Sequence, residues 1–208
     1  MAQKNPKQTS YKLKNGRNVL FEGKLDYLIS GSGEVKVHTS LTPGKDNTGL
    51  FDIPCFGVTV NLDRSFENIE YFGRGEDENM PDFKCHAPVG IYETSVTESF
   101  EPYVYPQYSG VHGDTRWVKL TDKDAGRSLT FIADGAFSFT AHPFTDAMID
   151  RAAHIEDISD MGLTALALNG VMRGIGSSSC GPGTRAEYRL DARKGYEFSF
   201  TLVPGELR

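Results

Sequence analysis

The chain has 208 residues, a formal net charge of −6, 38% hydrophobic residues and 24% charged residues. This composition is typical of a globular protein and excludes wholesale disorder. The apolar stretches are far shorter than the ~20 residues of a membrane-spanning helix, so no membrane partner is expected. Nucleic acid is disfavoured too, because a basic patch would be needed and only the amino-terminal end is rich in lysine.

Strands are predicted along the whole chain, because apolar and polar residues alternate with a period of two. The polar residues 1–15 are expected to be a flexible tail, and residues 16–208 are expected to form one domain. The apolar residues of Phe56–Leu62 share one face, as do those of Tyr196–Leu202. Asp134 and Gly135 separate two alternating runs and predict a two-residue hairpin turn.

One helix is predicted over residues 145–155, where Met148, Ala152 and Ile155 fall at helical spacing. Thr145 is expected to cap its first turn. Many short strands with one short helix predict an all-β, antiparallel sandwich. The first ten residues lack the apolar segment of a secretory signal, so a cytoplasmic location is expected.

Four carboxylates lie close together after a predicted strand, at Glu76, Asp77, Glu78 and Asp82. Paired carboxylates are the acid and base of glycoside hydrolysis, but one of them must have a raised pKa. Burial is what raises a carboxyl pKa, and nothing in this glycine-rich segment predicts it. We therefore expect a structural loop and assign no catalytic residue.

Aromatic residues gather downstream, at Tyr103, Tyr105 and Tyr108. Exposed tyrosine rings could stack on the C–H faces of a sugar. The alternative is that these rings fill the core or cover its edge, since aromatic side chains dominate core burial. The second interpretation is favoured, and the three tyrosines are retained as candidate sugar-stacking residues.

No metal site is predicted, because the five histidines and three cysteines are scattered. Only His112 and Asp114 lie close together, whereas a metal needs three or four donors. The segment around Cys180 is rich in glycine and serine but lacks the nucleophile elbow of serine hydrolases. It is interpreted as a loop at the rim of a pocket.

Several of these segments together resemble the small chain, or carboxy-terminal fifth domain, of family 2 β-galactosidases. The most specific match is Tyr71–Gly75 followed by Glu78, Asn79 and Asp82. Further matches, in the same order as in the family, are Ile53–Gly57, Pro102–Gln107, Asp114–Trp117 and Gly174–Pro182. The similarity runs from Val19 to Pro204, with the amino-terminal part of the family domain missing.

The resemblance implies an antiparallel β-supersandwich related to the galactose-mutarotase fold. It implies that Cys180, with Ser179 and Gly181, lies next to a galactoside bound by a separate catalytic barrel. In the family, the catalytic glutamates and the magnesium and sodium ligands belong to that barrel, so no cofactor is expected in this chain. The expected partners are the barrel, as a fused domain or a large chain, and a β-galactoside such as lactose.

The expected function is therefore that of an accessory domain, which completes the galactoside site and supports assembly. One alternative is a freestanding carbohydrate-binding module without catalysis, built on the tyrosines or the Cys180 segment. A further alternative is a structural role in which a sheet face forms a subunit contact and the chain oligomerises.

Overall fold

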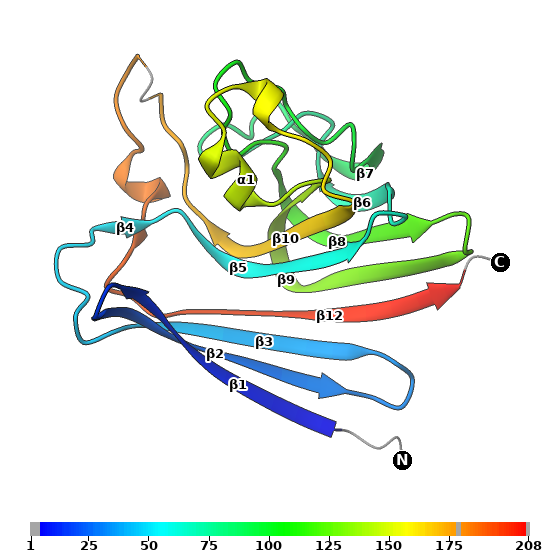
Figure 1. Cartoon of the computed structure of the whole chain (residues 1–208), viewed down its shortest axis with the longest axis horizontal. Coiled ribbons are helices and arrows are strands. Elements are labelled where there is room, and N and C mark those ends of the chain that lie inside the picture. Colours follow the sequence, from blue (N-terminus) through cyan, green and yellow to red (C-terminus); the bar gives the residue numbers. More distant parts are fainter. Residues whose placement is uncertain (1–4, 178–179, 207–208) are drawn as a thin grey trace.

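The computed structural model describes residues 5–177 and 180–206, and an antiparallel sheet dominates it (Figure 1). The strands are β1 (Asn5–Asn15), β2 (Asn18–Ile29), β3 (Val35–Pro43), β4 (Asp52–Ile53), β5 (Cys55–Asp63), β6 (Asn68–Arg74), β7 (Val89–Ser95), β8 (His112–Asp122), β9 (Arg127–His142), β10 (Leu163–Met172), β11 (Leu190–Asp191) and β12 (Tyr196–Glu206). The helices are α1 (Asp146–Arg151) and two 3₁₀ turns, η1 (Ile155–Asp157) and η2 (Ala186–Tyr188). The predicted antiparallel β-architecture with one short α-helix is confirmed.

Strand β9 belongs to two parts of the sheet at once. Its first half, Arg127–Ala133, pairs with β12, and its second half, Ser138–His142, pairs with β10, which in turn pairs with β5. The main path of the sheet runs β1-β2-β3-β12-β9-β8-β6-β7. In Figure 1, β10 lies between β9 and β5 on the side that carries α1.

The residues at the middle of β9 correct one prediction. Asp134 and Gly135 do not form a hairpin turn, because the strand continues through them and pairs with β8 on both sides. Gly135 has a φ of +104°, a conformation that glycine adopts without steric cost. The glycine therefore marks the point where β9 exchanges one neighbour for another.

The amino-terminal residues correct a second prediction. Residues 5–15, expected to be a flexible tail, are strand β1, which pairs with β2 from Asn5 opposite Ile29 to Asn15 opposite Asn18. A two-residue turn with Gly16 at its first position (φ +58°) connects them, a typical hairpin signal. The lysines of β1 suit an edge strand, because exposed charges oppose pairing with further chains.

The hydrophobic core is formed by apolar side chains of strands that the alternation predicted. Phe56 is buried on β5 while Thr59 and Asn61 are exposed, and Phe198 and Phe200 are buried on β12. Phe131, Phe139, Leu120 and Leu166 are fully buried among them, and α1 adds Ile149. No helix in the described residues is long and apolar enough to span a membrane.

The predicted helix is shorter than expected. It ends at Arg151, and its register is broken before the separate 3₁₀ turn that starts at Ile155. Thr145 occupies the N-cap position, but its side chain makes no capping hydrogen bond and instead approaches the Met161 sulfur at 3.9 Å.

Candidate functional site

Two loops meet at a short turn that carries the acidic residues. We call residues 76–82, which follow β6, the acidic turn; residues 100–110, which precede β8, the aromatic loop; and residues 174–183, which follow β10, the Cys180 loop. In Figure 1 the segment between β10 and η2 (orange) projects from the end of the sheet opposite the two termini.

Glu78 joins the acidic turn to the aromatic loop. One oxygen of its carboxylate accepts a hydrogen bond from the Gly110 backbone N–H at 2.8 Å, and the other accepts one from the Tyr103 hydroxyl. The bond to this carboxylate raises the pKa of Tyr103 to about 12. The aromatic loop is thus fixed at Tyr103 and at Gly110, and the Glu78 carboxylate accepts both hydrogen bonds.

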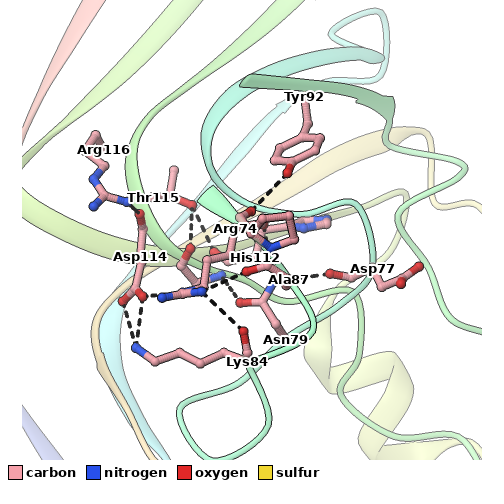
Figure 2. Close-up of polar contacts among 12 residues, drawn as sticks. Arg74, Asp77, Asn79, Lys84, Ala87, Tyr92, His112, Asp114, Thr115 and Arg116 are labelled. Carbon is pink, nitrogen blue, oxygen red and sulfur yellow. Dashed lines mark hydrogen bonds and ion pairs between the residues drawn. The ribbon is translucent and has the colours of Figure 1, made fainter. Parts of the chain in front are cut away.

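Asn79 joins the same turn to the start of β8. Its fully buried side chain donates to the backbone oxygens of Arg74 and Asp77, both at 3.2 Å, and accepts from the Gly113 N–H at 3.0 Å. Figure 2 shows it enclosed by these backbone groups. All three of these hydrogen bonds go to backbone groups, so the buried amide holds the turn against β8.

Asp82 joins the acidic turn to the Cys180 loop. Its two oxygens accept hydrogen bonds from the backbone N–H groups of Ile175 at 3.1 Å and Gly176 at 2.6 Å. The sequence matches in this turn therefore perform one common task, which is to fix two loops and the start of β8 from distant parts of the chain. The expectation that the carboxylates belong to a structural loop agrees with these contacts.

Asp114 is the centre of a second charged group. It accepts from Arg74 Nε at 2.5 Å and lies 2.9 Å from Lys84 Nζ (Figure 2). Burial alone would raise the pKa of Asp114, but the hydrogen bonds from Arg74 and Lys84 outweigh it and hold the pKa below its usual value. Arg116 donates to the Asp114 backbone oxygen. Asp114 and Arg116, two residues of the Asp114–Trp117 match, thus hold the start of β8 to the end of β6 and to Lys84.

His112 is separated from Asp114 rather than paired with it. Its Nδ1 lies 2.9 Å from the Tyr71 hydroxyl in the core, and burial lowers the pKa of His112 to about 4. His142 is buried to the same extent, and its Nε2 has no hydrogen-bond partner in the described chain. The alternating pattern gave no signal for these two buried imidazoles, because the sequence does not show which strand faces are doubly covered.

Two of the candidate substrate-adjacent residues, Cys180 and Gly181, lie at the far end of the Cys180 loop. Cys180 is exposed, and its N–H donates to the Ser177 backbone oxygen at 3.2 Å. Gly181 is also exposed, whereas Ser179 lies outside the described residues. The other two cysteines differ: Cys85 is exposed, whereas burial raises the pKa of Cys55 to about 11.

Two cavities flank the base of the Cys180 loop. One of about 410 Å³ is lined by Asp82, Phe83, Ser177, Arg185 and Tyr188. The other, of about 390 Å³, lies on the side of Gly174 and Ile175 and includes Cys55, Tyr108 and Asp146 in its lining. Residues at the base of the loop therefore line both cavities.

The three candidate sugar-stacking tyrosines occupy different environments. Tyr105 is 73% exposed and Tyr103 is 41% exposed. Tyr108 is mostly enclosed, and its hydroxyl lies 3.2 Å from Thr140 Oγ1 and accepts from Asn169 Nδ2 at 3.2 Å. The structure brings Tyr105 and Tyr108 to the lining of one further cavity of about 530 Å³, but only Tyr105 offers it a largely free ring.

Comparison with known proteins gives one consistent similarity. The profile of a family described as "Beta galactosidase small chain" matches residues 2–202. The chain is 32% identical over 179 residues to a β-galactosidase of Lactobacillus delbrueckii, and the match covers 86% of the chain and 17% of that protein. It is also 32% identical over 185 residues to a β-galactosidase of Streptococcus thermophilus, and that match covers 88% of the chain and 18% of the relative. It thus spans less than a fifth of these curated relatives. A solved structure of an Escherichia coli protein titled a putative aldose 1-epimerase is similar with a TM-score of 0.47 and 11% identity, covering 99% of the chain and 69% of that protein.

Proposed function

The chain belongs to the β-galactosidase small chain family, and from this premise we propose that it is an accessory domain that completes the galactoside site of a separate catalytic barrel. In this proposal the barrel supplies the two carboxylates that glycoside hydrolysis requires. The small chain supplies a wall that orients the sugar and limits the access of water.

The Cys180 loop is the part of the chain that suits this role. Its base is held by Asp82, and its far end carries Cys180 with an exposed thiol. A loop that is fixed at one end and exposed at the other can present a small side chain to a neighbouring domain in a constant position. This contrast between an anchored base and an exposed tip is the observation that carries the proposal.

The carboxylates of the acidic turn, together with Asp114, support a structural rather than a catalytic role for these groups. Glu78 and Asp82 accept backbone hydrogen bonds, and Asp114 is paired with Arg74 and Lys84. A catalytic pair would need one carboxyl with a raised pKa beside an open site. Following the family resemblance, the proposal also places the magnesium and sodium ligands in the barrel.

A chimeric enzyme tests the proposal. In the L. delbrueckii relative, the matched segment is either deleted or replaced by this chain, and hydrolysis of a chromogenic β-galactoside is measured. We expect activity in the chimera and none in the deletion. Within the chimera, Cys180→Ala should raise KM, whereas Cys85→Ala, the other exposed cysteine, should not. Hydrolysis by the isolated small chain alone would contradict the non-catalytic assignment, as would a chimera no more active than the deletion.

The second candidate function is a freestanding carbohydrate-binding module. The observation in its favour is the exposed ring of Tyr105 beside a cavity that Gln107 also lines. Calorimetric titration of the isolated chain with galactose and lactose separates the two functions. Millimolar or tighter binding that Tyr105→Ala abolishes, and Val104→Ala in the same loop preserves, would favour the module. Absence of binding would leave the accessory role as the better account.

A further inference from the structure

The carboxylate of Asp82 attaches the base of the Cys180 loop to the acidic turn. Asp82 accepts the N–H groups of two consecutive residues, Ile175 and Gly176, one on each oxygen. Hydrogen bonds to an ionised carboxylate are about twice as strong as those between neutral groups. The position of this carboxylate thus determines where the loop leaves β10.

The loop sequence is adapted to the close approach of this carboxylate. A side chain at the buried Gly174 would overlap the Asp82 carboxylate itself. Gly176 has a φ of +68°, which disfavours other residues, and a side chain there would overlap the backbone N of Thr184. Two glycines are therefore required where the loop passes Asp82, and each is required by a different neighbour.

Other hydrogen bonds of the loop join its two arms, and the Gly174 N–H donates to the Tyr188 backbone oxygen of η2 at 3.0 Å. Thr184 Oγ1 donates to the Gly174 backbone oxygen at 2.8 Å, and the Ser177 N–H donates to the Pro182 oxygen at 3.1 Å. These bonds keep the two arms of the loop together. None of these bonds reaches the acidic turn, whereas the two bonds to Asp82 do.

We infer that Asp82 is the positioning residue of the Cys180 loop and holds it in the orientation that the galactoside site requires. The geometric part of this inference stands on the contacts above, and its relation to a galactoside rests on the proposed function. Asp82 acts on the substrate only through the loop backbone and is not a catalytic residue.

The acidic turn also contains a matched control. Glu78 lies on the same turn and accepts a backbone N–H in the same way, but from Gly110 of the aromatic loop. A change at Glu78 disturbs the same turn without touching the two amides that Asp82 holds. Any effect that depends only on the integrity of the turn should therefore appear in both variants.

The first test is amide hydrogen exchange of the isolated chain, followed by NMR at Ile175 and Gly176. Asp82→Ala should accelerate exchange at both amides by about 10- to 100-fold, since a charged acceptor is lost. Asp82→Asn retains one acceptor oxygen and should preserve protection at one of the two. Gly174→Ala, which keeps Asp82 but displaces its carboxylate, should reproduce the loss. Glu78→Gln should leave both amides protected.

Two results would overturn the positioning role. One is unchanged exchange at Ile175 and Gly176 in Asp82→Ala. The other is equal acceleration at every amide of the chain, which would indicate general destabilisation, and the Asp82→Asn and Gly174→Ala variants decide this if Asp82→Ala does not fold.

The chimeric enzyme supplies the second test. There Asp82→Asn should raise KM several-fold with a smaller change in kcat, while Glu78→Gln leaves KM unchanged. Unchanged KM in an active Asp82→Asn chimera would overturn the link to the galactoside. An inactive parent chimera would instead contradict the proposed function, and the exchange result would then decide the positioning role alone.

Discussion

Acidification from pH 7 to pH 5 is expected to destabilise the folded chain, because two buried imidazoles remain neutral in it. His112 is 5% exposed and His142 is 2% exposed. Burial lowers the pKa of each to about 4, from an ordinary value of 6.5. His142 is also stacked on Phe144 at a centroid distance of 5.2 Å, so a proton on its ring would introduce a charge into an apolar environment.

The sign and size of the effect follow from these pKa values. As the pH falls, the unfolded chain binds a proton at each histidine near pH 6.5, whereas the folded chain does so only near pH 4. Stability is therefore full above pH 6.5 and is lost progressively down to pH 4. Between pH 7 and pH 5, each histidine should lower the free energy of unfolding by about 1.8 kcal/mol, or about 3.6 kcal/mol for both.

Urea unfolding at pH 5, 6 and 7, followed by the fluorescence of Trp117, measures this dependence, because the chain has a single tryptophan. His142→Leu should lower stability somewhat at every pH but reduce the pH-dependent part by about half. His154→Gln, which removes an exposed imidazole, is the matched control. A free energy of unfolding that is unchanged or higher at pH 5 would refute the reasoning, as would an undiminished pH dependence in His142→Leu.

Three further predictions concern the core and the cysteines. Asn79→Ala should lower the free energy of unfolding by about 2–3 kcal/mol, because backbone groups lose their buried partner; an effect below about 0.5 kcal/mol in urea would contradict this. Gly57→Ala should destabilise by more than about 2 kcal/mol, because its side chain would overlap the Leu168 backbone oxygen, and a thermal midpoint equal to that of the wild type would show otherwise. Iodoacetamide at pH 8 should label the two exposed cysteines well before Cys55, whose pKa of about 11 leaves little thiolate. Mass spectrometry of the native chain checks the order, and early labelling of Cys55 would disprove it.

Much of the sheet could be predicted from local pattern. The alternation in Phe56–Leu62 and Tyr196–Leu202 identified faces that are buried or partly buried in the structure, since a strand places successive side chains on opposite sides. The short-range signals were less reliable. Asp134 and Gly135 suggested a turn but lie inside β9, where pairing with β8 on both sides outweighs the local preference for a turn.

The amino-terminal strand is a case in which local pattern predicted no structure although the segment is ordered. Residues 5–15 have little apolar character, so nothing in their composition predicted an ordered element. Their order comes from eleven residues of pairing with β2 and from the turn at Gly16. Backbone hydrogen bonds do not depend on side-chain polarity, and the glycine was the one signal that could have revealed the hairpin.

The sequence by itself determined the strand-rich architecture and the family of this chain, because alternation and ordered motifs are properties of neighbouring residues. It also located the acidic residues of the candidate site on one turn. Only the tertiary structure decided what those residues do. Glu78, Asn79 and Asp82 each reach a segment that lies between 32 and 94 positions away. A hydrogen bond across such a separation depends on how the sheet closes rather than on any local pattern.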